Sequence, residues 1–442
     1  MAAPALEAVL SGAAGPEGVR AGLRSPALRR SLRRALGGLL APGAALGPVR
    51  VDRVKLKPGR KLSLWGRASV ESASGTRHDV PLAVTWVPPD AEAPSSSDDG
   101  PGAPSSDEER SRGPLRRWRA VDEATGMELL ASPFDPAAPE LAGLLAPGAV
   151  ADRPRATTVR YRPRQRHVLR YDAERSGTDP CWGKLVPGRD GAVVAATTAA
   201  LADGLAGSGH TVLRPLRLLG DAVLYPHAPG RPLPALLGAG PPGAPLVRCG
   251  EALRRVHDLP QAALAAGREV TLDGELAAVA RAGEHLAELH PPAGDVLAGV
   301  LAAARSALRG SPVEVAPGHG DCKLDHFWVE DRGVTFIDVD SAVLADPARD
   351  LGKLLADLRW WAARDVVRDL GSARRSVASG YDGSAPDPDR WARAAVWEGV
   401  WLAKAVVRRT SLLDRDWSAR TLGGLREAAA LVDDAAPVMA EA

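Results

Sequence analysis

The sequence predicts an α+β fold in which strands and helices are segregated along the chain. Between residues 157 and 228, five short apolar segments with the composition of strands surround one Ala-rich helical segment at 191–206. From residue 245 onward, apolar residues recur every three or four positions, which is typical of amphipathic helices. A strand-rich part followed by a helical part is the element order of an α+β protein.

The composition indicates an ordinary globular protein. The 442 residues are enough for two or three domains, and the formal net charge of +2 gives no sign of a nucleic-acid partner. No apolar run approaches the roughly 18 residues that span a bilayer. The three cysteines, Cys181, Cys249 and Cys322, are too widely spaced for a zinc site or a disulfide framework. We therefore expect a cytoplasmic protein without a nucleic-acid or membrane partner, either a monomer or a homodimer.

Changes in composition and in the spacing of apolar residues along the chain predict three regions. They are an N-terminal accessory domain, a small strand-rich lobe and a large helical lobe, at residues 1–150, 151–230 and 231–442. Within the first region we expect a basic helix at 17–40 and strands over 51–130. Residues 88–114 contain almost no apolar side chains, which predicts a disordered loop. The basic helix could contact a membrane surface or a nucleic acid, but a solvated helix face is the simpler interpretation.

Two carboxylates stand in a spaced pair of motifs. The sequence GHGDCKLDHF begins at residue 318, and an apolar segment, VTFI, leads into Asp338. Asp321 precedes Asp338 by seventeen residues, a separation that suits a hairpin with both carboxylates at one end of a sheet. Phosphoryl transfer needs such a set, because one carboxylate accepts the proton of the attacking hydroxyl and others hold Mg²⁺. Each Asp could instead cap a turn, but the spaced pair favours a site.

These motifs, His-Gly-Asp-x-x-x-x-His and Ile-Asp-x-Asp, resemble the catalytic core of the aminoglycoside phosphotransferase and choline kinase-like family. The resemblance implies a protein-kinase-like fold, with a five-stranded small lobe over a helical large lobe and an extra N-terminal helix-plus-β domain. It implies that Asp321 is the catalytic base, that Lys323 touches the transferred phosphate, and that Asp338 holds Mg²⁺. It also implies ATP or GTP as the phosphate donor.

In the small lobe, the resemblance places the phosphate-gripping lysine at Lys184. A lone lysine on a strand is more often an edge charge, but Lys184 precedes a helix as the family's lysine does. The loop between the first two strands of this lobe is basic and contains no glycine. Arg162 and Arg166 would therefore grip phosphate in place of a glycine-rich cradle. Residues 225–233 resemble the hinge between the lobes, whose backbone would meet the adenine.

Two departures from the family pattern put catalysis in question. His326 stands where most of the family has Asn, and imidazole is a softer ligand than Mg²⁺ prefers. The helix after Lys184 contains no Glu to pair with that lysine, only Asp203 near its end. A catalytically degraded nucleotide-binding regulatory protein, or an interaction protein that works through residues 1–150, therefore stays open. The expected metal ligands are Asp338, His326 and Asp340, with Asp325 as a further candidate.

The sequence favours a small acceptor. Only seven residues separate Asp338 from Asp346, which leaves no room for the long activation segment that docks peptides in protein kinases. We expect a phosphotransferase that uses ATP or GTP and acts on a hydroxyl of an aminoglycoside, amino sugar, sugar or amino-alcohol. Trp397 and Trp401, four apart on one helix face, could stack on the acceptor or belong to the core. Asp346 should cap the next helix, and Asp350 should be a structural anchor.

Overall fold

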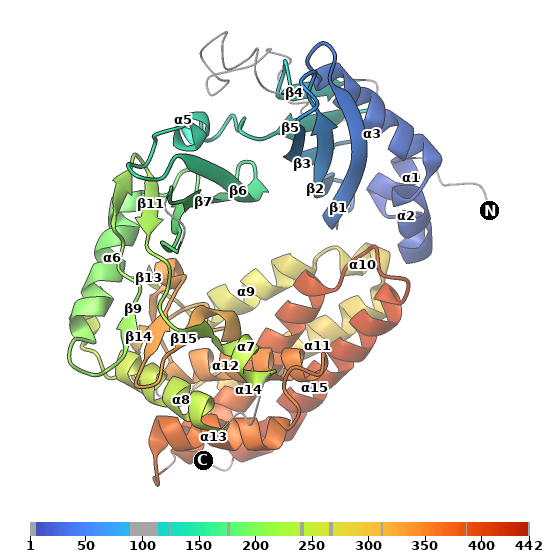
Figure 1. Ribbon diagram of the computed structural model, residues 1–442. Helices are drawn as coiled ribbons and strands as arrows, with labels where there is room; N and C mark the ends of the chain where they lie inside the picture. The colour runs from blue at the N-terminus through green and yellow to red at the C-terminus, as the bar shows by residue number, and fades with distance from the viewer. Residues whose placement is uncertain are drawn as a thin grey trace.

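A computed structural model shows the architecture of the protein (Figure 1). It describes residues 6–88, 114–123, 125–174, 177–238, 243–264, 268–310, 313–385 and 387–440. The predicted disordered loop at 88–114 lies outside these residues, apart from its first and last positions. None of the helices in the described ranges combines the length and the apolar character needed to cross a membrane.

The N-terminal region combines three helices with a five-stranded antiparallel sheet. The helices are α1 (Leu6–Ser11), α2 (Gly15–Leu23) and α3 (Pro26–Leu39). The strands are β1 (Ala45–Lys57), β2 (Lys61–Glu71), β3 (Arg77–Trp86), β4 (Arg119–Asp122) and β5 (Met127–Ala131), in the order β1-β2-β3-β5-β4.

The basic segment at 17–40 forms two helices instead of the single helix expected. Ser25 has extended backbone angles, and its hydroxyl caps α3 by accepting a hydrogen bond from Leu28 N at 3.2 Å. Pro26 then begins α3, since proline suits a first helical turn and disfavours a helical residue before it. Three of the four leucines of α3 are buried and its arginines are exposed, which agrees with a solvated helix face: Leu32, Leu36 and Leu39, and Arg29, Arg30, Arg33 and Arg34.

The small lobe contains the five-stranded antiparallel sheet and the single long helix that the sequence predicts. Its strands are β6 (Arg155–Arg162), β7 (Arg166–Asp172), β8 (Cys181–Leu185), β10 (Arg217–Leu219) and β11 (Ala222–Tyr225), in the order β10-β11-β8-β7-β6. The helix is α6 (Gly191–Gly204), which Asp190 caps. Strand β9 (Thr211–Val212) leaves this sheet and pairs in parallel with β16 (Val334–Phe336) of the large lobe.

The large lobe is mainly helical, as the periodicity of the sequence indicates. Its longer helices are α8 (Gly243–His257), α9 (Leu272–Gly283), α11 (Pro291–Leu308), α12 (Pro347–Ala362), α13 (Leu370–Asp382), α14 (Pro388–Arg409) and α15 (Trp417–Ala440). Helices α12 and α14 pack closely because Gly352 has no side chain, and a Cβ there would lie 2.4 Å from that of Trp397. Two small sheets lie between these helices and the small lobe. One has the order β12 (Arg231–Pro232), β15 (Phe327–Val329), β16 and β9, and the other has the order β13 (Arg268–Glu269), β17 (Val343–Ala345) and β14 (Ala316–Gly318). The predicted α+β order, with a strand-rich small lobe followed by a helical large lobe, is confirmed.

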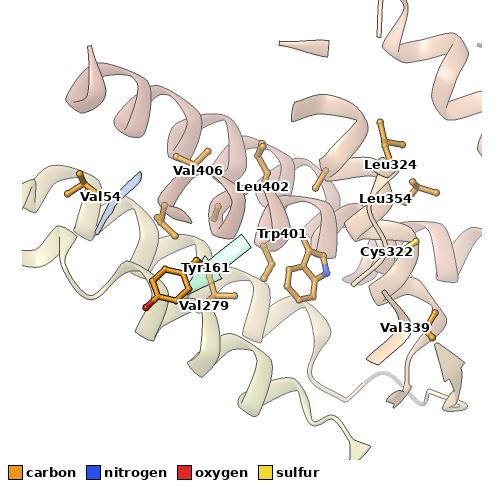
Figure 2. Close-up of a cluster of buried hydrophobic side chains, with 14 of the residues drawn as sticks. Val54, Tyr161, Val279, Cys322, Leu324, Val339, Leu354, Trp401, Leu402 and Val406 are labelled. Atoms are coloured by element: carbon orange, nitrogen blue, oxygen red, sulfur yellow. The ribbon is translucent and has the colours of Figure 1, made fainter. Parts of the chain in front are cut away.

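One continuous hydrophobic core joins all three regions (Figure 2). Val54 of β1 and Tyr161 of β6 lie in the same cluster as Leu402 and Val406 of α14. The N-terminal sheet is also held by polar contacts, including Arg53, whose guanidinium donates to the carbonyl oxygen of Arg408 at 2.9 Å. Strand β1 is therefore packed against the end of α14, close to the loop that carries Asp321.

Candidate active site

The loop around Asp321 depends on a glycine. Strand β14 (Ala316–Gly318) leads into this loop, and Gly320 has a φ of +79°. A Cβ at Gly320 would lie 1.7 Å from the carbonyl oxygen of Ser341. Since no side chain fits and the backbone is left-handed, only glycine allows Asp321 to lie beside the loop that follows Asp338.

Asp350 of α12 holds the same loop in place through hydrogen bonds to its backbone. Its carboxylate accepts hydrogen bonds from the backbone N–H of His319 at 2.6 Å and of Gly320 at 3.2 Å. Burial disfavours the charged carboxylate, but His257 and Arg349 outweigh burial and lower the pKa of Asp350 to about 2. Asp350 is thus a structural anchor, as expected, and Asp346 caps α12 by accepting from Ala348 N at 3.0 Å.

His319 joins the two halves of the motif. Its Nε2 donates to the carbonyl oxygen of Ile337 at 3.1 Å, and its Nδ1 accepts from the backbone N–H of Asp321 at 3.3 Å. The ring is almost fully buried and lies against Phe336. His319 therefore holds the Asp321 loop against the strand that ends at Asp338, a role that the sequence analysis did not assign.

Asp321 is a half-buried carboxylate between two lysines. One oxygen contacts Lys323, and the other lies 3.1 Å from Nζ of Lys353, which reaches it from α12. Burial disfavours its charge, but Lys353 and Lys323 outweigh burial and hold the pKa of Asp321 well below its usual range. Asp321 is therefore ionised at neutral pH and able to accept a proton. The sequence analysis expected Lys323 here and missed Lys353.

Asp321, His326 and Asp338 form a cluster that could hold a metal ion. One potential ligand atom from each lies within 4.8 Å of the others. Burial and then Lys323 lower the pKa of His326 to about 3, so its imidazole is neutral and can act as a ligand. The two carboxylates are the hard oxygen ligands that suit Mg²⁺, and the imidazole suits it less well. The donor set fits a divalent cation.

Lys184 and Asp340 lie beside this cluster. Lys184 Nζ contacts Asp338 and lies 2.5 Å from Asp340 Oδ1. Arg189 Nη1 bonds the carbonyl oxygen of Asp340 at 2.8 Å, and Arg166 Nη1 lies 3.7 Å from Asp338 Oδ2. The acidic partner of Lys184 thus comes from the large lobe rather than from α6. Asp340 is not part of the three-residue cluster, and its role as a metal ligand stays a prediction.

A cavity of about 330 Å³, here called the hinge cavity, opens next to Lys184. Its walls include Val168, Lys184, residues 225–228 and residues 336–339, so Asp338 faces it. On the hinge side, Trp182 donates through Nε1 to His227 Nδ1 at 3.3 Å. The cavity is largely apolar with charged groups at one end, a shape that suits a flat ring attached to an anionic tail.

A second cavity of about 600 Å³, here called the basic cavity, lies on the other side of the Asp321 loop. Its lining includes nine Lys or Arg residues and three Asp residues, and Asp321 is one of the three. Arg160, Arg166 and Asp325 line both cavities, so the two meet. A larger cavity of about 1220 Å³, between the N-terminal sheet and β6, contains none of the predicted site residues.

Of the remaining predicted residues, Arg162 and Trp401 line the basic cavity and Trp397 does not. Arg162 lines this cavity and not the hinge cavity, and its guanidinium lies 5.8 Å from the centre of the Trp65 ring. Its contact with the nucleotide phosphates stays a prediction. Trp401 and Trp397 are both buried and stack at 6.1 Å, which favours a core role for this pair.

Residues 184–393 match the family model for the phosphotransferase enzyme family. This segment is slightly less than half of the chain, begins at Lys184, and includes both Asp321 and Asp338. The family resemblance that the motifs indicate is therefore confirmed. No curated protein matches the chain.

Several solved structures are similar to the chain at low sequence identity. A choline/ethanolamine kinase family protein from Mesorhizobium loti is 17% identical, covers 69% of this chain and 96% of its own, and gives a TM-score of 0.47. Aminoglycoside phosphotransferase APH(3'')-Id from Streptomyces rimosus is 22% identical, covers 58% and 96%, and gives 0.40. Macrolide 2'-phosphotransferase MphH from Brachybacterium faecium is 17% identical, covers 63% and 91%, and gives 0.38.

Proposed function

We propose that this protein, whose residues 184–393 match the model of the phosphotransferase enzyme family, transfers the terminal phosphate of ATP or GTP to a hydroxyl group of a small molecule. The observation that carries the proposal is the placement of two carboxylates between two cavities. Asp338 faces the hinge cavity, Asp321 faces the basic cavity, and potential ligand atoms of the two lie within 4.8 Å.

The hinge cavity is the nucleotide site in this proposal. The base would lie between Val168 and the backbone of residues 225–228, and the phosphates would extend toward Lys184 and Arg166. Lys184 is held near this position by Asp338 and Asp340. A lysine and an arginine on the phosphates reduce the charge that builds up on the transferred group.

The basic cavity is the acceptor site, and Asp321 is the base. Asp321 accepts the proton of the acceptor hydroxyl as the oxygen forms its bond to the terminal phosphorus. The bond to the leaving nucleoside diphosphate breaks in the same displacement. Lys323, two residues after Asp321, is placed to contact the phosphate in transfer. His326 and Asp338 would hold Mg²⁺, which would neutralise phosphate charge when bound.

The acceptor classes that the family resemblance suggests are aminoglycosides, amino sugars, sugars and amino-alcohols. They share a hydroxyl group, and that group is what the proposal requires. The nucleoside triphosphate donor is consistent with the cytoplasmic location expected from cysteine usage.

The test is turnover by the full chain. Purified protein is incubated with Mg²⁺ and ATP or GTP and a panel of hydroxyl-bearing metabolites. Diphosphate release and the phosphorylated product are both measured, with Asp321→Asn as the control. Acceptor-dependent product from the wild type alone supports the proposal. Nucleotide binding without product from any acceptor would favour the second candidate, a nucleotide-binding regulatory protein, which His326 and the lack of a Glu in α6 keep open.

A further inference from the structure

The basic cavity has more positive charge than its own carboxylates neutralise. Two of its three carboxylates are already paired. Asp321 contacts Lys323 and Lys353, and Asp357 lies 2.6 Å from Nη1 of Arg409. The third, Asp325, is 59% exposed at its side chain, so water screens it. Six of the nine cations in the lining are outside these pairs.

Three of these cations converge from two regions of the chain. Arg53 comes from β1 of the N-terminal sheet, and Lys404 and Arg408 come from the last turns of α14. Among the described residues, none of the three forms an ion pair with a carboxylate. Arg53 instead donates to the backbone oxygen of Arg408 at 2.9 Å, which brings two guanidinium-bearing residues together.

Burial and neighbouring cations lower the pKa of two of these groups. Burial and then the neighbouring Arg408 lower the pKa of Arg53. Burial and then Lys353 lower the pKa of Lys404 to about 7. Partly buried cations that repel each other are stabilised when an anion lies between them, because the anion supplies both the opposite charge and hydrogen-bond acceptors.

Two of the three tryptophans that line the cavity, Trp401 and Trp360, already face cations. Nζ of Lys353 lies 4.0 Å from the centre of the Trp401 ring, and Nζ of Lys404 lies 4.3 Å from it. Trp360 is contacted in the same way by Arg364 at 3.6 Å. An ammonium group on the acceptor would therefore find these rings occupied by cations and would be repelled by them.

We propose that the acceptor carries an anionic group, a phosphate or a carboxylate, in addition to its hydroxyl, and that Arg53, Lys404 and Arg408 bind this group. That the bound molecule is the phosphate acceptor rests on the proposed function, whereas the anion site itself does not. It gives the N-terminal sheet a function, since Arg53 completes a site whose other walls belong to the kinase-like lobes. Sugar phosphates and sugar acids fit this chemistry, and aminoglycosides and amino sugars do not.

The first experiment measures anion binding without turnover. Inorganic phosphate is titrated by calorimetry into the full chain saturated with ADP and Mg²⁺, which occupies the nucleotide site. Arg53→Gln and Lys404→Gln should each weaken phosphate binding roughly tenfold, the loss expected for one charge-assisted hydrogen bond. The matched control is Arg50→Gln, which removes an exposed arginine of the same strand outside the cavity. ADP affinity and melting temperature confirm that each variant is folded, and Lys404→Gln tests the site if Arg53→Gln is unstable.

The second experiment compares acceptors that differ in one group: glucose, glucosamine and glucose 6-phosphate. We expect phosphorylation to be most efficient with the phosphate-bearing sugar, and Lys404→Gln to raise its KM with little change in kcat. Preference for glucosamine or an aminoglycoside would overturn the inference and leave the proposed function standing. Phosphate binding that is equal in Arg53→Gln, Lys404→Gln and Arg50→Gln, or absent from the wild type, would also overturn it. Loss of binding in the cavity variants without any turnover would support the anion site and contradict the proposed function.

Discussion

The hinge cavity and the basic cavity meet at Arg160, Arg166 and Asp325 but are built differently. The hinge cavity is lined by the small lobe and the strands next to Asp338, and most of its wall is apolar. The basic cavity takes residues from the N-terminal sheet, the β6–β7 hairpin, α12 and α14, and most of its charged residues are cations. The nucleotide site that we propose is thus built mainly from one lobe and its neighbouring strands, whereas the acceptor site that we propose is assembled from distant parts of the chain.

The largest expected effect is the loss of turnover when the proposed catalytic base is removed, and it distinguishes the two cavities. Asp321→Asn removes the proton acceptor on the basic side, so turnover on a confirmed acceptor should fall by roughly 10²–10⁴. Nucleotide affinity should stay close to that of the wild type, because Asp321 faces the acceptor side. Steady-state rates and nucleotide titration measure the two quantities. Unchanged turnover would show that Asp321 is not the base.

Asp338→Asn should affect the hinge cavity. It removes a carboxylate that faces the hinge cavity and contacts Lys184. The affinity for the Mg²⁺–nucleotide complex should fall by roughly 10- to 100-fold, the cost of one charged hydrogen-bonding group. Titration of a fluorescent nucleotide with Mg²⁺ and with a chelator isolates the metal-dependent part. Weakened acceptor binding with intact nucleotide binding would reverse the assignment of the two cavities.

His326 offers a further test of the comparison between the two cavities, because its ring lies in the cluster that contains both Asp321 and Asp338. Its Nε2 is 3.4 Å from Asp338 Oδ2, and the ring stacks on His319. If His326 holds the metal or a metal-bound water, His326→Ala should raise the Mg²⁺ requirement roughly tenfold. His326→Asn should preserve activity. If both variants change the melting temperature but leave the Mg²⁺ titration unchanged, His326 is a packed loop residue.

The smallest expected effect concerns the docking of the strand that supplies Arg53. His285 is buried beside this strand, and burial followed by Lys55 lowers its pKa to about 4. The unfolded chain binds a proton on this residue near pH 6.5 and the folded chain does not, so stability is lost as pH falls below 6.5. Between pH 7 and pH 5.5 the free energy of unfolding should fall by about 1 kcal/mol.

The control for this effect is His285→Gln, which removes the titrating group. Urea unfolding at the two pH values should show a smaller loss of stability in the variant than in the wild type, by about 1 kcal/mol. An equal loss in both proteins would mean that His285 does not carry the effect. Comparing the two proteins also cancels the contribution of His326, whose pKa is lowered in the same direction.

The sequence by itself determined the class of fold and the core of the site. Helix and strand periodicity gave the segregated α+β order, because burial of one face repeats along a single element. The motif residues Asp321, Lys323, His326 and Asp338 lie within eighteen positions, so the local hairpin between them brings them together. The break in the basic segment at Pro26 was also encoded locally, although we expected a single helix there.

The tertiary structure alone decided the surroundings of that core. Lys353 and Lys404 reach the basic cavity from α12 and α14, and Arg53 reaches it from β1, more than 260 positions before Asp321. Neither motif spacing nor periodicity records which distant side chains share a cavity, because that depends on how packed elements meet. The same holds for Lys184, whose acidic partners come from the large lobe rather than from α6. Charge in the basic cavity is therefore a property of packing between regions, and a sequence with a net charge of +2 gives no sign of it.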